Sequence, residues 1–304
     1  MVYASIHRLI GNTPLVELTS FAKKGISLFA KLEGYNPGGS MKDRLGMYLV
    51  EDALKKGKLQ EGGTIIEPTA GNTGIGIALA AIGRNLHVMF VVPEQFSQEK
   101  QELMKALGAE IVNTPSHLGM VGAIEKAKQM VQEIPGAYAP LQFENPANPE
   151  AYYYSLGPEI WKQMDGQIDI FIAGAGTGGT FMGCARYLKE QNPSLKTVIV
   201  EPQGSILNGG EKGVHRTEGI GMEFIPHYMD PSYFDAIHTI LDEEAFRMVK
   251  EVARKEGIFA GSSSGAVLQA ALIEQEKAPQ GSRIAMVFPD SSERYFSKNI
   301  YGGE

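Results

Sequence analysis

Residues 168–180 read IDIFIAGAGTGGT, an apolar run that passes directly into a glycine-rich turn. The same order recurs at residues 63–81, which read GTIIEPTAGNTGIGIALAA and end in a helical pattern. Further short apolar runs occupy residues 86–92, 196–201 and 283–288. Runs of this kind are typical of strands that are buried on both faces. Their alternation with helical patterns predicts an α/β fold, in which parallel sheets are covered by helices.

A segment rich in proline and asparagine interrupts this order. Residues 141–149 read LQFENPANP, which can continue neither a helix nor a central strand. We therefore expect the chain to cross between two sheets here, with a domain boundary near residue 145. The expected smaller domain spans residues 44–145, and the expected larger domain comprises residues 1–43 and 146–304.

The composition narrows the class of protein. The 304 residues carry a formal net charge of −7, which gives no basic surface for nucleic acid or an anionic membrane. The single cysteine, Cys184, excludes an intramolecular disulfide and a multi-cysteine metal site, and it is typical of a reducing compartment. No stretch approaches the roughly 18 apolar residues of a membrane helix. We expect a cytoplasmic protein without a metal, nucleic-acid or membrane partner.

One loop carries a candidate reactive lysine. Residues 36–44 read NPGGSMKDR, in which Ser40 and Asp43 predict a helix capped by Ser40. Lys42 then lies in the first helical turn, where unpaired N–H groups make the local potential positive. Such a potential lowers the pKa of a lysine and favours the neutral amine that imine formation requires. Taken alone, the motif is also typical of a solvated lysine at a helix start.

Two further loops can bind anions. Residues 68–74 present backbone N–H groups at a helix N-terminus, and Asn72 adds an amide. Residues 174–180 match the G-x-G-x-x-G pattern of dinucleotide sites, and Glu201 follows about twenty residues later, where an acid could hold a ribose. Thr177 and Thr180 supply hydroxyls that suit a terminal phosphate group instead. This loop alone leaves both ligands open.

Together these motifs resemble the cysteine synthase and cystathionine β-synthase family, the fold-type II pyridoxal-phosphate enzymes with a fold like that of tryptophan synthase β. The resemblance extends over nearly the whole chain. It rests on IGNTPL (10–15), NPGGSMKDR (36–44), EPTAGNTGIG (67–76), GTGGT (176–180), EP (201–202), EGIG (218–221), FIP (224–226) and FPDSSERY (288–295). ILNGG (206–210) and HRTE (215–218) are similar to the bacterial O-acetylserine-dependent cystathionine β-synthases.

The resemblance implies individual roles. Lys42 corresponds to the catalytic lysine that binds pyridoxal 5′-phosphate as a Schiff base. Asn72 corresponds to the residue at the cofactor's phenolic oxygen, and Ser291 to the hydroxyl at its pyridine nitrogen. The phosphate cup corresponds to Gly176, Thr177, Gly178, Gly179 and Thr180. The substrate carboxylate is expected to contact Thr69, Ala70, Gly71, Asn72, Thr73 and Gln142, in a domain expected to be mobile.

Two positions depart from the common family pattern. Ala70 stands where many relatives have serine, so the carboxylate loop has one hydroxyl fewer. Asp290 precedes Ser291, as in the cystathionine β-synthases, whereas cysteine synthases more often have serine there. A serine at the pyridine nitrogen does not hold that nitrogen protonated, which favours β-elimination over transamination. An aspartate in contact with the nitrogen would remove this preference.

The implied reaction is β-replacement on O-acetylserine, or on serine, by a thiol. Homocysteine as the thiol would give cystathionine, and sulfide would give cysteine. Glu223 stands where cystathionine β-synthases have an acid and cysteine synthases a small or neutral residue. It is therefore a candidate for binding the ammonium group of homocysteine, with Gly221 and Ser263 in the same pocket. A solvated loop carboxylate is the alternative for Glu223.

Other functions and partners stay open. A plain cysteine synthase, a serine dehydratase of the same cofactor class and an NAD-binding oxidoreductase are the competing interpretations. The resemblance implies small amino-acid substrates and a homodimer. It leaves open whether a serine acetyltransferase binds.

Overall fold

The computed structural model describes residues 2–69, 71–94 and 96–302, so the expected substrate contact Ala70 lies outside the described residues. Contacts between Cα atoms divide the chain into two compact units. The first unit comprises Met1–Ile10 and Ser40–Asn148, and the second comprises Gly11–Gly39 and Pro149–Glu304. Each unit is built on a sheet of its own, which confirms the expected α/β class.

The division differs from the expected one at residues 1–10, 40–43 and 146–148, which belong to the first unit. The ring of His7 makes a 2.8 Å hydrogen bond to the carbonyl oxygen of Leu79, and this bond ties the first residues to that unit. Residues 40 and 41 directly precede a helix of the first unit, and residues 42 and 43 begin that helix. A proline-rich boundary can be recognised in a sequence, but a terminal segment that packs on a distant helix cannot.

The first unit contains a parallel sheet with helices around it. Its strands lie in the order β5-β4-β3-β6 and pair in parallel. Its elements are η1 (Ile6–Leu9), α1 (Lys42–Lys55), β3 (Thr64–Pro68), α2 (Asn72–Ala81), β4 (His87–Pro93), α3 (Gln98–Ala106), β5 (Glu110–Thr114), η3 (Ser116–Leu118), α4 (Gly119–Glu133) and β6 (Ala137–Tyr138).

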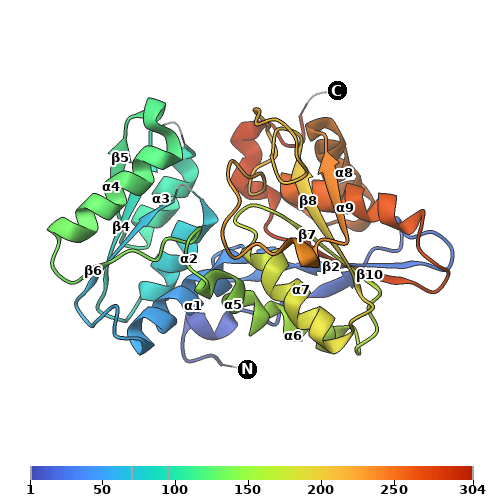
Figure 1. Ribbon diagram of the computed structural model, residues 1–304, viewed down its shortest axis with the longest axis horizontal. Helices are drawn as coiled ribbons and strands as arrows, with labels where there is room; N and C mark the ends of the chain where they lie inside the picture. Colours follow the sequence, from blue (N-terminus) through green and yellow to red (C-terminus); the bar gives the residue numbers. More distant parts are fainter. Residues whose placement is uncertain (1, 70, 95, 303–304) are drawn as a thin grey trace. The chain divides into compact units, whose positions relative to one another are not determined.

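Helix α4, drawn in green in Figure 1, covers this sheet. Ala123, Ala127 and Met130 form a buried stripe at helical spacing and pack against Ile66 of β3 and Val91 of β4. The alternation of apolar and polar residues along α4 therefore reflects one face on the sheet and one face in solvent.

The second unit contains a larger sheet with the strand order β1-β2-β10-β7-β8-β9. Strand β1 is antiparallel to β2, and the other neighbours are parallel. Its elements are β1 (Leu15–Glu17), β2 (Ser27–Leu32), η2 (Glu33–Tyr35), α6 (Leu156–Gln163), β7 (Ile170–Gly174), α7 (Gly179–Gln191), β8 (Lys196–Pro202), η4 (Pro231–Tyr233), β9 (Ala236–Ile240), α8 (Asp242–Glu256), α9 (Ser262–Gln275), β10 (Arg283–Phe288) and η5 (Ser292–Lys298), while α5 (Ala147–Tyr153) begins at the boundary.

Helix α9 is buried on the sheet of the second unit. Val267 and Ala271 share a core with Ile172 of β7, Val198 of β8 and Met286 of β10. Helix α8 packs against α9 in turn (Figure 1). The strand expected at residues 283–288 is observed with those bounds as β10, since a nearly continuous apolar run between turns has little freedom to shift.

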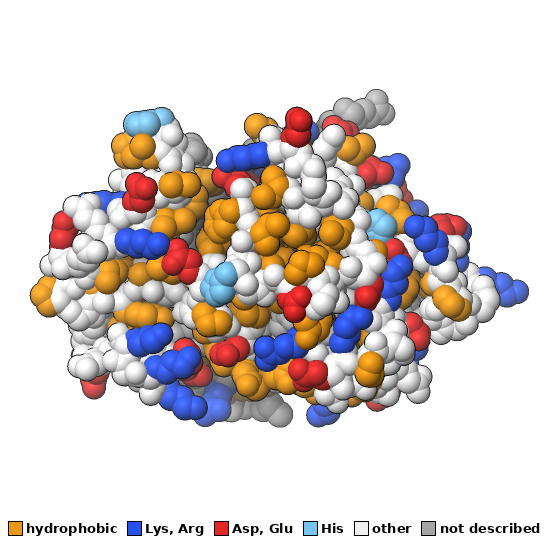
Figure 2. Space-filling model, viewed as in Figure 1, with side chains coloured by type: hydrophobic (Ala, Val, Ile, Leu, Met, Phe, Trp, Pro, Cys, Tyr) orange, Lys and Arg blue, Asp and Glu red, His pale blue; other side chains and the backbone are white. Residues whose placement is uncertain are grey.

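The described residues can be compared with the features of a membrane span and of a metal centre. In the part of the chain that the structure describes, no helix is long and apolar enough to cross a membrane. Among the same residues, no group of three or more His, Cys, Asp or Glu side chains is placed to hold a metal ion. Figure 2 shows acidic and basic side chains interspersed over the visible face.

Candidate active site

Lys42 is the first residue of α1. The expected helix cap at Ser40 is displaced by one residue, because Met41 occupies the N-cap position. The Ser40 hydroxyl still accepts a 3.2 Å hydrogen bond from the backbone N–H of Lys42. Burial lowers the pKa of Lys42 to about 8, and the charge of Glu67 acts in the opposite direction. The lowered pKa was expected from the helix terminus, whereas burial is its main cause.

The start of α1 lies directly against α2. A Cβ atom on Gly76 of α2 would be 2.2 Å from the carbonyl oxygen of Lys42, and one on Gly46 of α1 would be 2.2 Å from the carbonyl of Gly76. No side chain therefore separates the two backbones at this point. These two glycines fix the position of the lysine backbone. No sequence motif indicated this role.

The loop before α2 contains the expected carboxylate contacts. Gly71 occupies the N-cap position of α2, and Asn72 begins the helix. The hydroxyl of Thr69 accepts a 3.3 Å hydrogen bond from the N–H of Gly71. Thr73 donates a 2.7 Å hydrogen bond from its hydroxyl to Oε1 of Gln142. The structure thus brings Gln142 to the first turn of α2, as the expected shared role requires.

Glu67 lies beneath this loop, at the carboxyl end of β3, and is fully buried. Its carboxylate accepts hydrogen bonds from two successive backbone N–H groups, those of Leu141 at 2.7 Å and Gln142 at 3.1 Å. Burial raises the pKa of Glu67 to about 7, although these hydrogen bonds and the charge of Lys42 lower it. No sequence motif indicated a role for Glu67.

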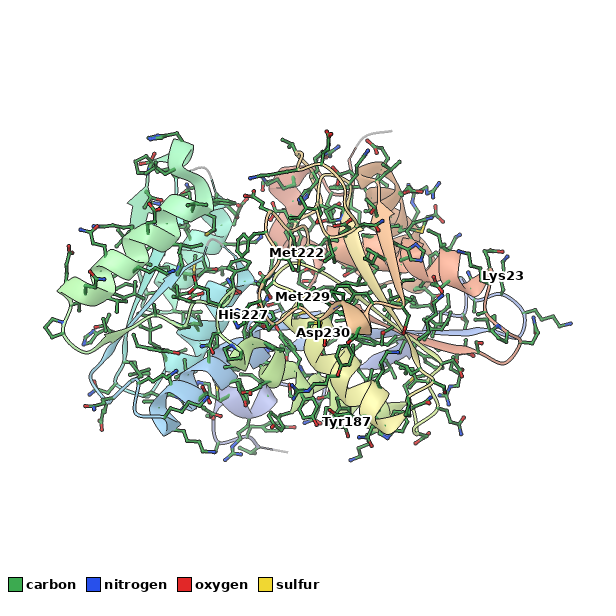
Figure 3. The ribbon with its side chains drawn as sticks, viewed as in Figure 1. Lys23, Tyr187, Met222, His227, Met229 and Asp230 are labelled. Carbon is green, nitrogen blue, oxygen red and sulfur yellow. The ribbon has the colours of Figure 1, made fainter. Side chains whose placement is uncertain are left out.

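In the second unit, the loop between β7 and α7 has the form of a phosphate cup. Gly178 has a φ of +81°, a left-handed conformation that favours glycine. A Cβ atom there would also lie 2.0 Å from Sδ of Met229 and 3.1 Å from Cε of Met222, two side chains labelled in Figure 3. One on Gly176 would be 2.3 Å from the carbonyl oxygen of Gly219. The back of the loop is therefore packed against protein.

The donors of this loop suit a phosphate monoester. Gly179 begins the thirteen-residue helix α7, so the loop ends at a helix N-terminus with N–H groups that have no partner within the helix. Thr177 and Thr180 add hydroxyls and are 8% and 4% exposed. Tyr228 donates a 2.9 Å hydrogen bond to the carbonyl oxygen of Thr177 and so holds the loop.

Glu201 has a different role from the one a dinucleotide site would require. It is fully buried at the carboxyl end of β8. Its carboxylate accepts hydrogen bonds from the N–H groups of Leu207 at 2.9 Å and Asn208 at 3.0 Å, and from the hydroxyl of Thr239 at 3.0 Å. Because these groups surround it, the carboxylate is not available to a ribose. The second unit therefore favours a phosphate monoester over a dinucleotide.

Ser291 and Asp290 follow β10. Asp290 is 4% exposed and accepts a hydrogen bond from the hydroxyl of Tyr295. Burial and the adjacent charge of Asp290 raise the pKa of Tyr295 well above its ordinary value. Ser291 is only partly buried and lies at the N-cap of η5. Asp290 is thus engaged by its own segment, and Ser291 is the more accessible of the two.

The remaining expected residues lie in the segment after Glu201 and at the start of α9. The N–H of Gly221 donates a 2.8 Å hydrogen bond to the carbonyl oxygen of Ala175, which ties this segment to the phosphate loop. Ser263 is buried in the first turn of α9. Glu223 is exposed and forms an ion pair of 2.7 Å with Lys212.

A partly buried lysine with a lowered pKa and a phosphate cup at a helix terminus are typical of an α/β enzyme that uses a phosphorylated cofactor. The chain belongs to the family described as pyridoxal-phosphate dependent enzymes, whose model matches residues 6–290. Pyridoxal phosphate is therefore its cofactor. Lys42 suits the cofactor's carbonyl group and residues 176–180 suit its phosphate, so the residues present fit this group.

Relatives with known names match over their full length. The O-acetylserine dependent cystathionine beta-synthase of Bacillus subtilis is 60% identical over 303 residues, which cover 99% of both chains. A cysteine synthase of Helicobacter pylori is 51% identical over 304 residues, covering 99% of both chains. The crystal structure of the O-acetylserine dependent cystathionine beta-synthase from Helicobacter pylori matches with a TM-score of 0.95 and 50% identity, covering 99% of this chain and all of that one.

The contact between Gly76 and Lys42 gives a stability prediction. Gly76→Ala removes a glycine from a helix, which alone would stabilise by about 0.5–1 kcal/mol. Its methyl group, however, would be 2.2 Å from the Lys42 carbonyl oxygen, so α1 and α2 must separate. We expect a net loss of about 1–3 kcal/mol in the free energy of unfolding, measured in urea.

Gly213→Ala is the control for this measurement, because Gly213 is an exposed loop glycine where a Cβ atom would meet its nearest neighbour at an ordinary 3.4 Å. It should leave the free energy of unfolding within about 0.5 kcal/mol of the original value. Equal stability of the Gly76→Ala variant and the unmodified protein would contradict a tight backbone contact at this position.

Proposed function

We propose that this enzyme replaces the acetoxy group of O-acetylserine with a thiol, and that homocysteine is the main acceptor and sulfide a second one. The products are cystathionine and cysteine, respectively. The observation that carries this proposal is the 60% identity over the full chain to an O-acetylserine dependent cystathionine beta-synthase. Serine is a second candidate donor, because it shares the amino-acid part of the substrate.

Four parts of the chain would hold the cofactor. Lys42 binds its carbonyl carbon, Asn72 donates to its phenolic oxygen, residues 176–180 bind its phosphate, and Ser291 faces its pyridine nitrogen. When bound, pyridoxal phosphate supplies an electron sink that makes the α-proton of the amino-acid substrate acidic. The engagement of Asp290 by Tyr295 supports Ser291 as the partner of the nitrogen.

Nζ of Lys42 is the group that moves the α-proton. Once the substrate amine has displaced it, Nζ accepts the proton from the substrate Cα, and it returns the proton after the thiol has added at Cβ. A base works best when its pKa lies near the working pH, and the pKa of Lys42 is lowered to about 8. Burial thus adapts an ordinary lysine to both proton transfers.

The loop before α2 would bind the substrate carboxylate. The candidate donors are the backbone N–H groups and side chains of Thr69, Gly71, Asn72 and Thr73, together with the amide of Gln142. Ala70 contributes at most its backbone N–H. Binding at the N-terminus of α2 places the carboxylate where the helix potential favours an anion.

Glu223 would select the acceptor by binding the ammonium group of homocysteine, with Gly221 and Ser263 shaping the same pocket. In the resting protein Glu223 is paired with Lys212. Exposed ion pairs contribute only about 0–1 kcal/mol, so a ligand ammonium can replace that lysine at little cost. The pairing therefore leaves the carboxylate accessible to a ligand.

One competition assay tests the proposed function. The cofactor-loaded enzyme receives O-acetylserine with equal concentrations of homocysteine and sulfide, and cystathionine and cysteine are separated and quantified. We expect both products, with cystathionine in excess. Cysteine as the sole product would instead favour a plain cysteine synthase, for which the 51% identity to such an enzyme is the supporting observation. Pyruvate formed from serine without a thiol would favour a dehydratase.

The role of Glu223 predicts a selective effect. Glu223→Ala should reduce cystathionine formation about 10-fold, the usual effect of losing one hydrogen bond to a charged group, and leave cysteine formation unchanged. Glu211→Ala is the control, since Glu211 is an exposed acid of the same segment. An equal loss of both products, or no loss of either, would show that Glu223 does not select the acceptor.

The lowered pKa of Lys42 predicts the pH dependence of cofactor capture. Only the neutral amine attacks a carbonyl, so capture by the apoenzyme should rise with pH around a midpoint of about 8. An ordinary lysine would give a midpoint of about 10.4. Borohydride trapping followed by peptide mass analysis measures the bond, and Lys42→Ala should give no adduct. A midpoint near 10 would mean that Nζ is solvated.

We also propose a cytoplasmic homodimer. Support for self-association comes from exposed aromatic side chains of the second unit, namely Tyr35, Phe259 and Phe296, which are 70%, 60% and 62% exposed. The sole cysteine, Cys184, is buried and forms no disulfide, which suits a reducing compartment. Binding of a serine acetyltransferase is testable by mixing the two proteins and measuring their mass in solution.

A further inference from the structure

The buried carboxylate of Glu67 closes a turn that is strained without it. Leu141 has a φ of +50°, a left-handed conformation that is unfavourable for a residue with a side chain. The N–H groups of Leu141 and Gln142 nevertheless both point at Glu67, which accepts one hydrogen bond on each oxygen. Hydrogen bonds to an ionised acceptor are stronger than neutral ones, so the carboxylate can hold the chain in this conformation.

The turn held by Glu67 determines where Gln142 lies. Glu67 fixes the backbone N–H of Gln142, and Asn148 donates a 2.8 Å hydrogen bond to its carbonyl oxygen. Thr73 donates to the side-chain oxygen of Gln142 from the first turn of α2. Gln142 is therefore fixed on both sides of its Cα atom and at its side chain. A single buried acid links the end of β3 to the loop before α2.

We propose that Glu67 is a positioning residue for the carboxylate of the amino-acid substrate, acting through the turn at Leu141 and Gln142. This inference rests on the proposed function for its choice of ligand. Glu67 itself does not contact the substrate. It holds Gln142 and, through Gln142, Thr73 in the arrangement that receives the carboxylate.

The charge of Glu67 also acts on Lys42. It favours the ammonium form of Lys42, and the charge of Lys42 in turn favours the carboxylate form of Glu67. A buried acid with two N–H donors and a nearby cation stays ionised more readily than an isolated one. Loss of the carboxylate would therefore also disturb the lysine.

Glutamine is the informative substitution at this position. A carboxylate offers two acceptor oxygens, whereas an amide offers one oxygen and an NH₂ group that can only donate. In Glu67→Gln, one of the two backbone N–H groups would face another donor. The substitution preserves the volume of the side chain, so the turn is disturbed without leaving a cavity.

Glu201 provides a matched control within the same chain. It is likewise a fully buried glutamate before a proline at the end of a parallel strand. It also accepts hydrogen bonds from two successive N–H groups, those of Leu207 and Asn208. Its turn lies in the second unit, which contains none of the proposed carboxylate contacts. Glu201→Gln therefore makes the same chemical change without affecting the turn at Gln142.

The test compares two ligands on the cofactor-loaded enzyme. L-alanine has a carboxylate but no β-leaving group. L-alaninamide has a neutral carboxamide in place of that carboxylate. Their half-saturating concentrations are read from the change in cofactor absorbance. We expect the preference for L-alanine to fall about 10- to 100-fold in Glu67→Gln, the usual range for losing a hydrogen bond to a charged group, and to be unchanged in Glu201→Gln.

Amide hydrogen exchange over residues 138–145 gives a second measurement that needs no ligand. Exchange should be faster in Glu67→Gln and unchanged in Glu201→Gln. Glu67→Asp keeps the charge but shortens the side chain, and it should give intermediate values of both quantities. If Glu67→Gln does not accumulate as folded protein, Glu67→Asp provides the same comparison.

An unchanged preference for L-alanine in Glu67→Gln would overturn the proposal, even if exchange were faster. So would an equal loss of preference in Glu201→Gln. These outcomes are separate from the proposed function, which fails if the original enzyme forms no product from O-acetylserine and a thiol. Binding of L-alanine can still be measured in that case, and the role of Glu67 is then decided by the two ligands alone.

Discussion

The first turn of α1 lies against α2 with no side chain between them, and the proposed chemistry of the first unit depends on this contact. Gly76 meets the Lys42 carbonyl, and Gly46 meets the Gly76 carbonyl. Asn72 lies one turn before Gly76 and therefore on the same face of α2. The contact therefore fixes the backbone of Lys42 relative to α2. A methyl group at either glycine would push apart the two segments that are proposed to bind the cofactor and the substrate carboxylate.

In both units, a Glu-Pro dipeptide at the end of a parallel strand supplies an acceptor for backbone N–H groups. A turn that packs against the carboxyl end of a parallel strand presents backbone N–H groups that need acceptors, and this turn can belong to a distant part of the chain. Glu67-Pro68 and Glu201-Pro202 each place a buried carboxylate there to accept two successive N–H groups. The proline ends the strand because it has no N–H of its own. Of the two carboxylates, Glu67 is the one whose charge acts on Lys42, which is why the turn that it holds is proposed to take part in the chemistry.

Much of the fold could be predicted, because buried parallel strands and glycine-rich turns leave strong local patterns. The strand at residues 283–288 and the position of Lys42 in a first helical turn are examples. Contacts between distant residues could not be predicted in this way. Glu67 and Leu141 are 74 residues apart, and nothing in the local sequence of either indicates the other. The repeated Glu-Pro dipeptide was a visible signal, but its meaning depends on which N–H groups the fold brings to it.

The segment after Glu201 contains Glu223 and would select the acceptor thiol. Several hydrogen bonds hold it to the phosphate cup and to residues near the cup. Gly221 donates to Ala175, Tyr228 to Thr177, and the N–H of Met222 to the hydroxyl of Ser205. Substitutions at these positions would disturb the cup, so they cannot change the acceptor without also affecting the cofactor. Glu223 lies in the same segment, but its side chain is exposed to solvent. Among the ion pairs of the described residues, it takes part in one, with Lys212. Selectivity for the thiol can therefore change at residue 223 while the cup stays intact.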